Sequence, residues 1–246
     1  VAVGYGKNTK GAPHLAAKKC AKMIRRGLEG SKYKHKLFIT FISSSIVPDI
    51  PFLKKRRVIR DLHGFELLLS FIVDFIFPIL QVGQGRDDEV LEELSKKLWE
   101  YECIGGASCD DLNLENNYQW INSYVNKNLV VCLGLSINYA PKLRRTYGLI
   151  PTGKKFVITD LSRSGYVIKK INNKPAVTEY LSIMKWSEAL LDERLYRKVF
   201  YYPMVYKHGN KIEPKMFGLV YGDNFICPTR LIAHKKLEIY ISSGRD

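Results

Sequence analysis

The stretch PHLAAKKCAKMIRRGLEGSKYKHKLFITFIS, residues Pro13–Ser43, decides the fold. Its first part, Leu15–Leu28, places apolar residues along one face of a helix and basic residues along the opposite face. Pro13 suits the first turn of such a helix, and Gly30 suits its end. The last part, Leu37–Ile42, is apolar apart from one threonine, which is typical of a strand buried on both faces. The stretch therefore predicts a helix followed by a buried strand.

Segments on both sides of this stretch extend the alternation of strands and helices. Val1–Tyr5 is short, apolar and β-prone, and we expect Gly4 and Gly6 to break it. Asp87–Trp99 has the apolar spacing of an amphipathic helix, and Leu129–Ile137 has the composition of another strand. A chain that begins strand–helix–strand favours an α/β layer architecture.

Beyond about Pro141 the sequence becomes mostly strand-like. The elements predicted there are one helix, Ala176–Met184, and strands that include Phe156–Leu161, Tyr166–Ile171, Val199–Val205 and Leu237–Ser242. The fold class that follows is α/β, a layered sandwich with mixed sheets. Its predicted domains are an α/β half over residues 1–140 and a strand-rich half over residues 141–246.

An apolar insertion at about residues 46–82 interrupts the N-terminal half. Its part Phe65–Val82 is slightly shorter than the roughly 20 apolar residues of a membrane-spanning helix, and Asp74 lies near its middle. We therefore expect a helix packed in a core or under a lid. The basic run Lys54–Arg57 beside it leaves an alternative, which is seating on a membrane surface.

The composition is that of a globular protein with a large positive charge. The 246 residues carry 39 Lys+Arg against 24 Asp+Glu, a formal net charge of +15. Such an excess attracts polyanions and acidic membranes, so a nucleic-acid or anionic-membrane binding module is the alternative function. The basic residues are dispersed along the chain, however, and no RNP-like or helix-turn-helix pattern is visible, so nucleic acid is not the favoured partner.

Patterns that indicate catalysis or metal binding are missing from the sequence. The five cysteines form no CxxC pair, and the five histidines stand apart from one another and from the cysteines. No GxSxG or HExxH motif is present. We therefore expect no catalytic residues, no metal and no cofactor. Scattered cysteines and the lack of a signal peptide favour reduced thiols in a cytoplasmic protein.

The most specific local feature is the run Gly105-Gly106-Ala107-Ser108-Cys109-Asp110-Asp111. If Gly105 and Gly106 form a turn, their N–H groups can face an anion such as a ligand carboxylate. The carboxylates of Asp110 and Asp111 can accept hydrogen bonds from a ligand amine or bind a cation. The alternative is a tight turn in which the Asp side chains hydrogen-bond to local backbone.

A second small-residue run, Ser43-Ser44-Ser45, follows the predicted strand Leu37–Ile42. Hydroxyl groups in that position either cap a helix or contact a ligand. Ser43 and Ser44 are therefore candidate ligand-binding residues, together with Gly105, Gly106, Ser108, Asp110 and Asp111.

Several segments, in order, resemble one family, the FIST domains of F-box and intracellular signal-transduction proteins. The similar segments cover nearly the whole chain: Val1–Gly6, Leu37–Ser43, Ile104–Asp111, Tyr147–Thr159, Asn173–Tyr180 and Tyr202-Pro203. Two departures stand out. Residues 46–82 look longer and more apolar than in simpler members, and family members continue beyond the position of Asp246.

The resemblance implies a non-catalytic sensor of small ligands, including amino acids or their derivatives, that signals to a protein partner. It implies an N-terminal FIST part over residues 1–140 and an incomplete C-terminal FIST part over residues 141–246. A zwitterionic ligand would place its carboxylate on the N–H groups of Gly105 and Gly106, and its amine on Asp110 or Asp111.

Overall fold

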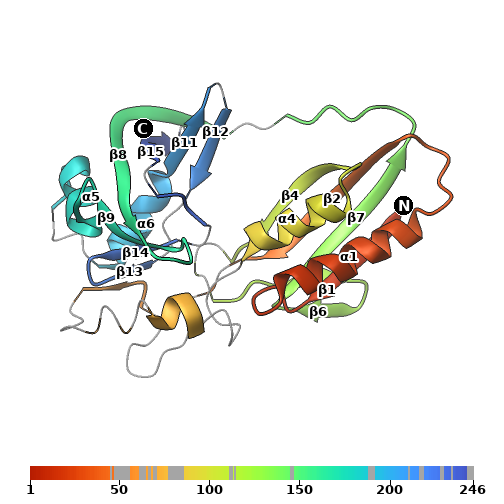
Figure 1. The fold of residues 1–246 in the computed structure, drawn as a ribbon, viewed down its shortest axis with the longest axis horizontal. Helices are drawn as coiled ribbons and strands as arrows, with labels where there is room; N and C mark the ends of the chain where they lie inside the picture. The colour runs from red at the N-terminus through yellow and green to blue at the C-terminus, as the bar shows by residue number, and fades with distance from the viewer. Residues whose placement is uncertain are drawn as a thin grey trace. The chain divides into compact units, whose positions relative to one another are not determined.

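The computed structural model describes residues 1–44, 46, 56–60, 65, 68, 71–76, 86–110, 113, 115–144, 147–187, 192–209, 211–215, 219–227, 230–233 and 235–242. The chain divides into two compact units, which are described separately. The first unit comprises Val1–Pro48 and Phe77–Arg145, and the second comprises Asp49–Ile76 and Thr146–Asp246. Figure 1 shows the helices and strands of both units.

The first unit is built on a four-stranded sheet with the strand order β1-β7-β2-β4. The strands are β1 (Ala2–Lys7), β7 (Leu129–Ile137), β2 (His35–Ser43) and β4 (Glu102–Ser108). β7 is antiparallel to both β1 and β2, and β4 is parallel to β2. Strands β1, β2 and β4 therefore all run in one direction. A small hairpin, β5 (Gln119–Ile121) and β6 (Tyr124–Asn126), precedes β7.

Two helices, α1 (Pro13–Gly27) and α4 (Asp87–Lys97), cover one face of this sheet. Figure 1 shows them side by side, and their apolar stripes share one core with β1, β2 and β7. The core includes Ile24 of α1, Leu94 of α4 and Phe38 of β2, all fully buried. Both predicted helices are confirmed at nearly their predicted bounds, because each apolar stripe has a sheet to pack on.

The expected break at Gly4 and Gly6 is wrong, because β1 runs through both glycines. The two residues are needed for the close approach of α1 to the strand. A Cβ atom at Gly6 would lie 1.9 Å from the carbonyl oxygen of Ala16, and one at Gly4 would lie 2.5 Å from that of Cys20. Glycine in a strand often marks such a close approach of two backbones.

The turn expected at Gly105 and Gly106 is also wrong, because both residues lie inside β4. They pair in parallel register with Thr40 and Phe41 of β2. A Cβ atom at Gly105 would lie 1.9 Å from the Thr40 carbonyl oxygen, whereas one at Gly106 would meet nothing within 4 Å. The chain leaves the strand only after Ser108.

The second unit is built on a nine-stranded mixed sheet in the described part of the chain. Along the sheet lie β12 (Lys211–Lys215), β11 (Met204–His208), β15 (Lys236–Ser242), β8 (Leu149–Leu161), β9 (Val167–Ile171), β14 (Asn224–Ile226), β13 (Leu219–Tyr221) and β3 (Val58–Ile59), with β10 (Lys174–Pro175) paired to β9. Its described α-helices are α5 (Ala176–Met184) and α6 (Glu193–Tyr201). The predicted α/β class with mixed sheets and a strand-rich second half is confirmed.

The strand expected at Val199–Val205 is wrong in its first half, because α6 extends to Tyr201 and β11 begins at Met204. The carboxylate of Asp192 accepts a hydrogen bond from the Arg194 N–H (2.8 Å) and caps the helix. One face of α6 is buried, comprising Leu195, Tyr196 and Val199. Helical spacing of these three residues outweighs the β-prone composition of the segment.

Most of the helix expected over Phe65–Val82 lies outside the described residues. Within them, Ile72–Ile76 form a short π-helix, η1, and the Asp74 carboxylate accepts a hydrogen bond from the Ser164 hydroxyl (2.5 Å). Burial in a core is wrong for four of the apolar side chains, because Phe65, Leu68, Phe71 and Phe75 are exposed, whereas Ile72 is half-buried. In the described part of the chain, no helix has the length and apolar character needed to cross a membrane.

The contact between α1 and β1 leads to a stability prediction. We expect Gly6→Ala to lower the free energy of unfolding by about 2 kcal/mol or more, because the added methyl group overlaps the backbone of α1. Gly106→Ala adds the same group to an open strand position and should change stability by less than about 0.5 kcal/mol. Urea unfolding followed by circular dichroism measures both, and equal effects would contradict the close contact.

Candidate functional site

The carboxyl ends of β1, β2 and β4 meet at one edge of the first sheet, because the three strands run in the same direction. The carboxyl edge of a parallel arrangement is where α/β proteins commonly bind ligands. Four predicted site residues lie here: Ser43 and Ser108 end β2 and β4, and Ser44 and Asp110 follow these strands. Gly105 and Gly106 lie further back in β4, and Asp111 is outside the described residues.

Gln119 joins the hairpin to this edge. Its side-chain amide donates a hydrogen bond to the Ser108 hydroxyl, and its carbonyl oxygen accepts one from the Leu129 N–H (3.3 Å). The Ser108 hydroxyl in turn lies 3.4 Å from the carbonyl oxygen of Ile42. Gln119 is almost fully buried, so these hydrogen bonds hold the end of β4, the hairpin and the start of β7 together.

Ser43 and Asp110 both make local contacts at the same edge. The Ser43 hydroxyl donates a hydrogen bond to the Lys127 carbonyl oxygen (2.5 Å). The Asp110 carboxylate accepts hydrogen bonds from the N–H groups of Glu115 (2.7 Å) and Asn116 (2.6 Å). This is the local-backbone arrangement that the sequence left open as the alternative for Asp110. These hydrogen bonds join Asp110 to the backbone of Glu115 and Asn116.

The loop between β1 and α1 supplies residues that the sequence analysis missed. The Asn128 side-chain oxygen accepts hydrogen bonds from the Thr9 hydroxyl (2.7 Å) and the Lys10 N–H (3.0 Å). The Lys10 carbonyl oxygen accepts another from the Arg86 guanidinium (3.2 Å). Thr9 and Asn128 are 119 positions apart, so no local pattern indicates their contact. The one feature of the sequence that could have indicated Lys10 is its position in the loop after β1, close to the carboxyl edge.

Lys10 is a buried cation, with 2% of its surface exposed. No carboxylate among the described residues lies within ion-pair distance of its ammonium group. Burial, together with the positive charge of Lys127, lowers the pKa of Lys10 to about 8, and burial is the larger cause. A buried ammonium without a counter-ion is costly, so folding shifts Lys10 toward its neutral form, although the ammonium still predominates at pH 7.

An apolar cavity of about 310 Å³ opens on the sheet face that α1 and α4 leave uncovered. Its walls come from all four strands of the sheet and the segment around the hairpin. They comprise Val3, Ile39, Phe41, Ser108, Tyr118, Gln119, Trp120, Val131, Cys132 and Leu133. Trp120, which is 71% exposed, and Tyr118 give the cavity two accessible aromatic rings. Apolar walls with few polar groups are typical of small-molecule pockets.

The cavity and the carboxyl edge adjoin, because Ser108 and Gln119 belong to both. The combined site offers apolar and aromatic surface on one side and hydroxyl, amide and carboxylate groups on the other. This arrangement suits a small ligand with one apolar end and one polar end. Within the described residues, His, Cys, Asp and Glu side chains form no group of three that could hold a metal ion.

The aromatic part of this site was also missed by the sequence analysis. Phe41 and Val131 lie on strands found at their predicted positions, but the expected burial of Leu37–Ile42 on both faces is wrong, because Phe41 is 54% exposed on the uncovered face. Trp120 lies in the β5–β6 hairpin, for which the sequence analysis named no candidate residue. The signal available in the sequence was that β2 and β7 carry apolar residues on both faces, whereas α1 packs against one face only.

Comparison with known proteins gives one family. Residues 2–174 match the FIST N domain. The match includes every described residue of the carboxyl edge and the cavity, and it continues through β8 and β9 of the second unit. No curated protein and no solved structure matches the chain. The predicted division into two FIST parts at residues 140 and 141 stays a prediction.

The burial of Lys10 leads to a prediction about pH. Because its pKa is about 8 when folded and 10.5 when unfolded, the unfolded chain binds more protons between these values. The free energy of unfolding should therefore rise as the pH increases from 8 to 10.5. Lys10→Met should remove this rise and stabilise the chain at pH 7 by up to about 3 kcal/mol, since no ammonium is then buried.

Urea unfolding at a series of pH values measures this effect. Lys142→Met, at an exposed lysine, is the matched control and should keep the wild-type dependence on pH. An unchanged pH dependence in Lys10→Met would show that the Lys10 ammonium is solvated.

Proposed function

The chain belongs to the FIST family, a group of sensory and signalling domains, and on this premise we propose that it is a sensor that binds a small ligand at the carboxyl edge of its first sheet. The observation that carries the proposal is the apolar cavity with the Ser108–Gln119 hydrogen bond at its polar end. The sensor binds and releases its ligand without bond chemistry, as FIST domains generally do.

The ligand proposed for this site is an amino acid, or a derivative of one, with an apolar or aromatic side chain. Its side chain occupies the cavity, where Phe41 and Trp120 offer apolar and aromatic surface. Aromatic pairs gain about 0.5–1.5 kcal/mol beyond the burial of area, which favours an aromatic ligand over an aliphatic one of equal size. A cavity of about 310 Å³ is at the small end of ligand pockets and suits one side chain.

The polar groups of the ligand face the carboxyl edge in this proposal. Ser108 is the polar residue that both lines the cavity and belongs to the predicted set. Ser43, Ser44 and Asp110 lie at the same edge and are the other described candidates for contact with the polar end. Gly105 and Gly106 contribute backbone, since β4 is the edge strand of the sheet formed by the described residues.

The signal in this proposal is a change in population between two states of the first unit. A ligand shifts such an equilibrium only by its difference in affinity for the two states. The hairpin is the element that transmits the change, because Gln119 links it to the edge and the Trp120 side chain is exposed. A protein partner then reads the state of the hairpin. All five cysteines are free thiols, which supports a cytoplasmic location.

A thermal-shift screen of apolar and aromatic amino acids, followed by calorimetry, tests the proposal. We expect phenylalanine, tryptophan or leucine to raise the melting temperature, since a ligand that binds only the folded chain stabilises it. Trp120→Ala should weaken the binding about tenfold, because part of the apolar wall is lost. Asp110→Asn combined with Asp111→Asn should weaken it as well if these carboxylates hold the ligand amine.

The matched control is Trp99→Ala, because Trp99 is an equally exposed tryptophan of the same unit that does not line the cavity. It should bind the amino acids as the wild type does. If none of the amino acids binds, or if Trp120→Ala binds them with unchanged affinity, the proposed site is wrong.

A further inference from the structure

Six basic side chains and one tryptophan form a continuous surface on the outer side of α1 and α4, which we name the basic surface. Its members are Lys18, Lys22, Arg25, Arg26, Lys96 and Lys97, with Trp99 beside them. Lys18, Lys22 and Arg25 follow one another at helical spacing along α1. The surface is hollowed at two places of about 470 Å³ each, and both hollows include Arg25 and Arg26.

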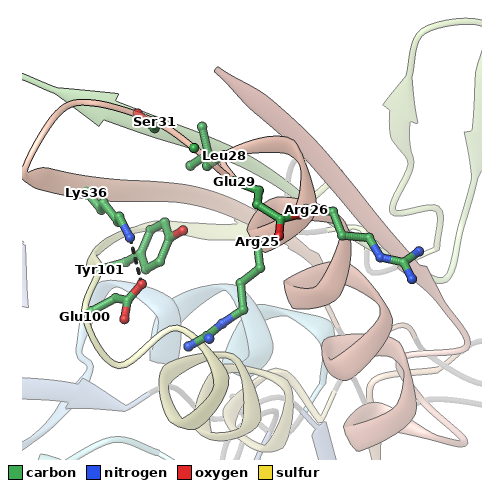
Figure 2. Close-up of a pocket in the computed structure, with 9 residues that line it drawn as sticks. Arg25, Arg26, Leu28, Glu29, Ser31, Lys36, Glu100 and Tyr101 are labelled. Carbon is green, nitrogen blue, oxygen red and sulfur yellow. Dashed lines mark hydrogen bonds and ion pairs between the residues drawn. The ribbon is translucent and has the colours of Figure 1, made fainter.

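Figure 2 shows the hollow at the end of α1. The guanidinium groups of Arg25 and Arg26 extend in different directions from the last turn of the helix. Arg25 donates a hydrogen bond from Nε to the Lys97 carbonyl oxygen (2.8 Å), which ties α1 to α4. Lys36 pairs with Glu100 at 2.8 Å on the far wall of the hollow. The hollow is therefore built from fixed side chains, although it is open to solvent.

The positive charge of the basic surface is only partly neutralised. Lys96 pairs with Glu92 at 2.6 Å, and Lys18 lies 4.0 Å from Glu93. In the described part of the chain, no carboxylate lies within ion-pair distance of Lys22, Arg26 or Lys97. These three cations are exposed and available to an anionic partner.

Helix stability explains only some of these residues. Arg25 and Arg26 lie in the last turn of α1, and Lys96 and Lys97 lie in the last turn of α4, where cations interact favourably with the helix dipole. Lys18 and Lys22 lie earlier in α1 and gain nothing from that effect. The dipole also gives no reason for an exposed tryptophan next to the cations.

Trp99 is 77% exposed, the most exposed of the three tryptophans. Trp186, by contrast, packs edge-to-face against Tyr180 and Tyr202. An indole ring exposed to water loses the favourable free energy of burying its apolar surface. The headgroup layer of a membrane accommodates both the apolar body of the ring and its polar N–H. Cations around such a ring are the common pattern of proteins that attach to the surface of anionic membranes.

We propose that the basic surface binds anionic phospholipid headgroups, with Trp99 inserted at the membrane interface. Its shape favours a membrane over single-stranded nucleic acid. Nucleic-acid grooves stack successive bases on several aromatic rings, and Trp99 is the only exposed aromatic residue among the described residues that line the two hollows. The other aromatic residue there, Tyr101, is buried. The cations also spread over two helices, as a plane of headgroups requires.

The basic surface and the proposed ligand site share no residues. α1 begins at the carboxyl edge, directly after the loop from β1, and the basic surface extends to its last turn. Membrane attachment therefore leaves the carboxyl edge and the cavity unobstructed by the residues that bind lipid. Either proposal can fail while the other holds.

Co-sedimentation with phosphatidylcholine vesicles, with and without phosphatidylserine, tests the proposal. We expect the chain to bind only the vesicles that contain phosphatidylserine, and to dissociate as salt is raised. Lys22→Glu combined with Arg26→Glu should weaken this binding about tenfold or more, since each basic residue near the surface contributes about 1 kcal/mol. Trp99→Ala should weaken it with little change in the dependence on salt.

The control variants carry the same types of substitution at exposed positions outside the basic surface. Lys170→Glu combined with Lys235→Glu makes the same charge reversal at exposed lysines of the second unit, and Trp120→Ala removes a different exposed indole. Both should bind vesicles nearly as the wild type does. Circular dichroism checks that each variant is folded. We expect folding to be retained, because all the substituted side chains are exposed.

Three outcomes would overturn the proposal. The first is no binding to phosphatidylserine vesicles at low salt. The second is an equal loss in the control variants, which would mean that the overall charge of +15 attracts the vesicles without a defined surface. The third is binding of an oligonucleotide through Lys22, Arg26 and Trp99 without binding of vesicles, which would assign the surface to nucleic acid.

Discussion

The first unit depends on the direct contact between the backbones of α1 and β1. No side chain fits between them at Gly6, where a Cβ atom would lie 1.9 Å from the Ala16 carbonyl oxygen. The helix meets the strand with small residues of its own, among them Ala16 and Cys20, so the two elements pack without a gap. This contact fixes the loop between them, and it thereby places Lys10 and Thr9 at the edge where the parallel strands end.

The same packing leaves the two faces of the sheet unequal. Both helices lie on one face, although β2 and β7 carry apolar side chains on both. The uncovered face keeps Phe41, Val131 and their neighbours accessible, and the aromatic residues near the hairpin complete a cavity there. An apolar surface of this kind is costly in water unless something binds it. The function proposed here follows from that imbalance, with polar groups supplied where the cavity meets the carboxyl edge.

Lysine and arginine serve two different purposes along α1. Lys10 precedes the helix, is buried, and has a pKa of about 8 because water is excluded from it. Lys22 and Arg26 lie on the exposed side of the helix and stay solvated. All three residues count equally in the formal charge, but their surroundings differ. Ionisation of the buried Lys10 is coupled to folding, whereas the exposed Lys22 and Arg26 attract anions.

The sequence by itself determined the α/β class, the bounds of α1, α4 and β7, the strand-rich second half and the membership of the FIST family. These features repeat over a few residues, so a local pattern contains them. Only the tertiary structure placed Gly105 and Gly106 inside a strand, made α6 a helix where a strand was expected, and buried Lys10. The cavity beside Trp120 also became visible only in the tertiary structure. Each of these depends on what a segment packs against, and partners such as Thr9 and Asn128 are 119 positions apart in the chain.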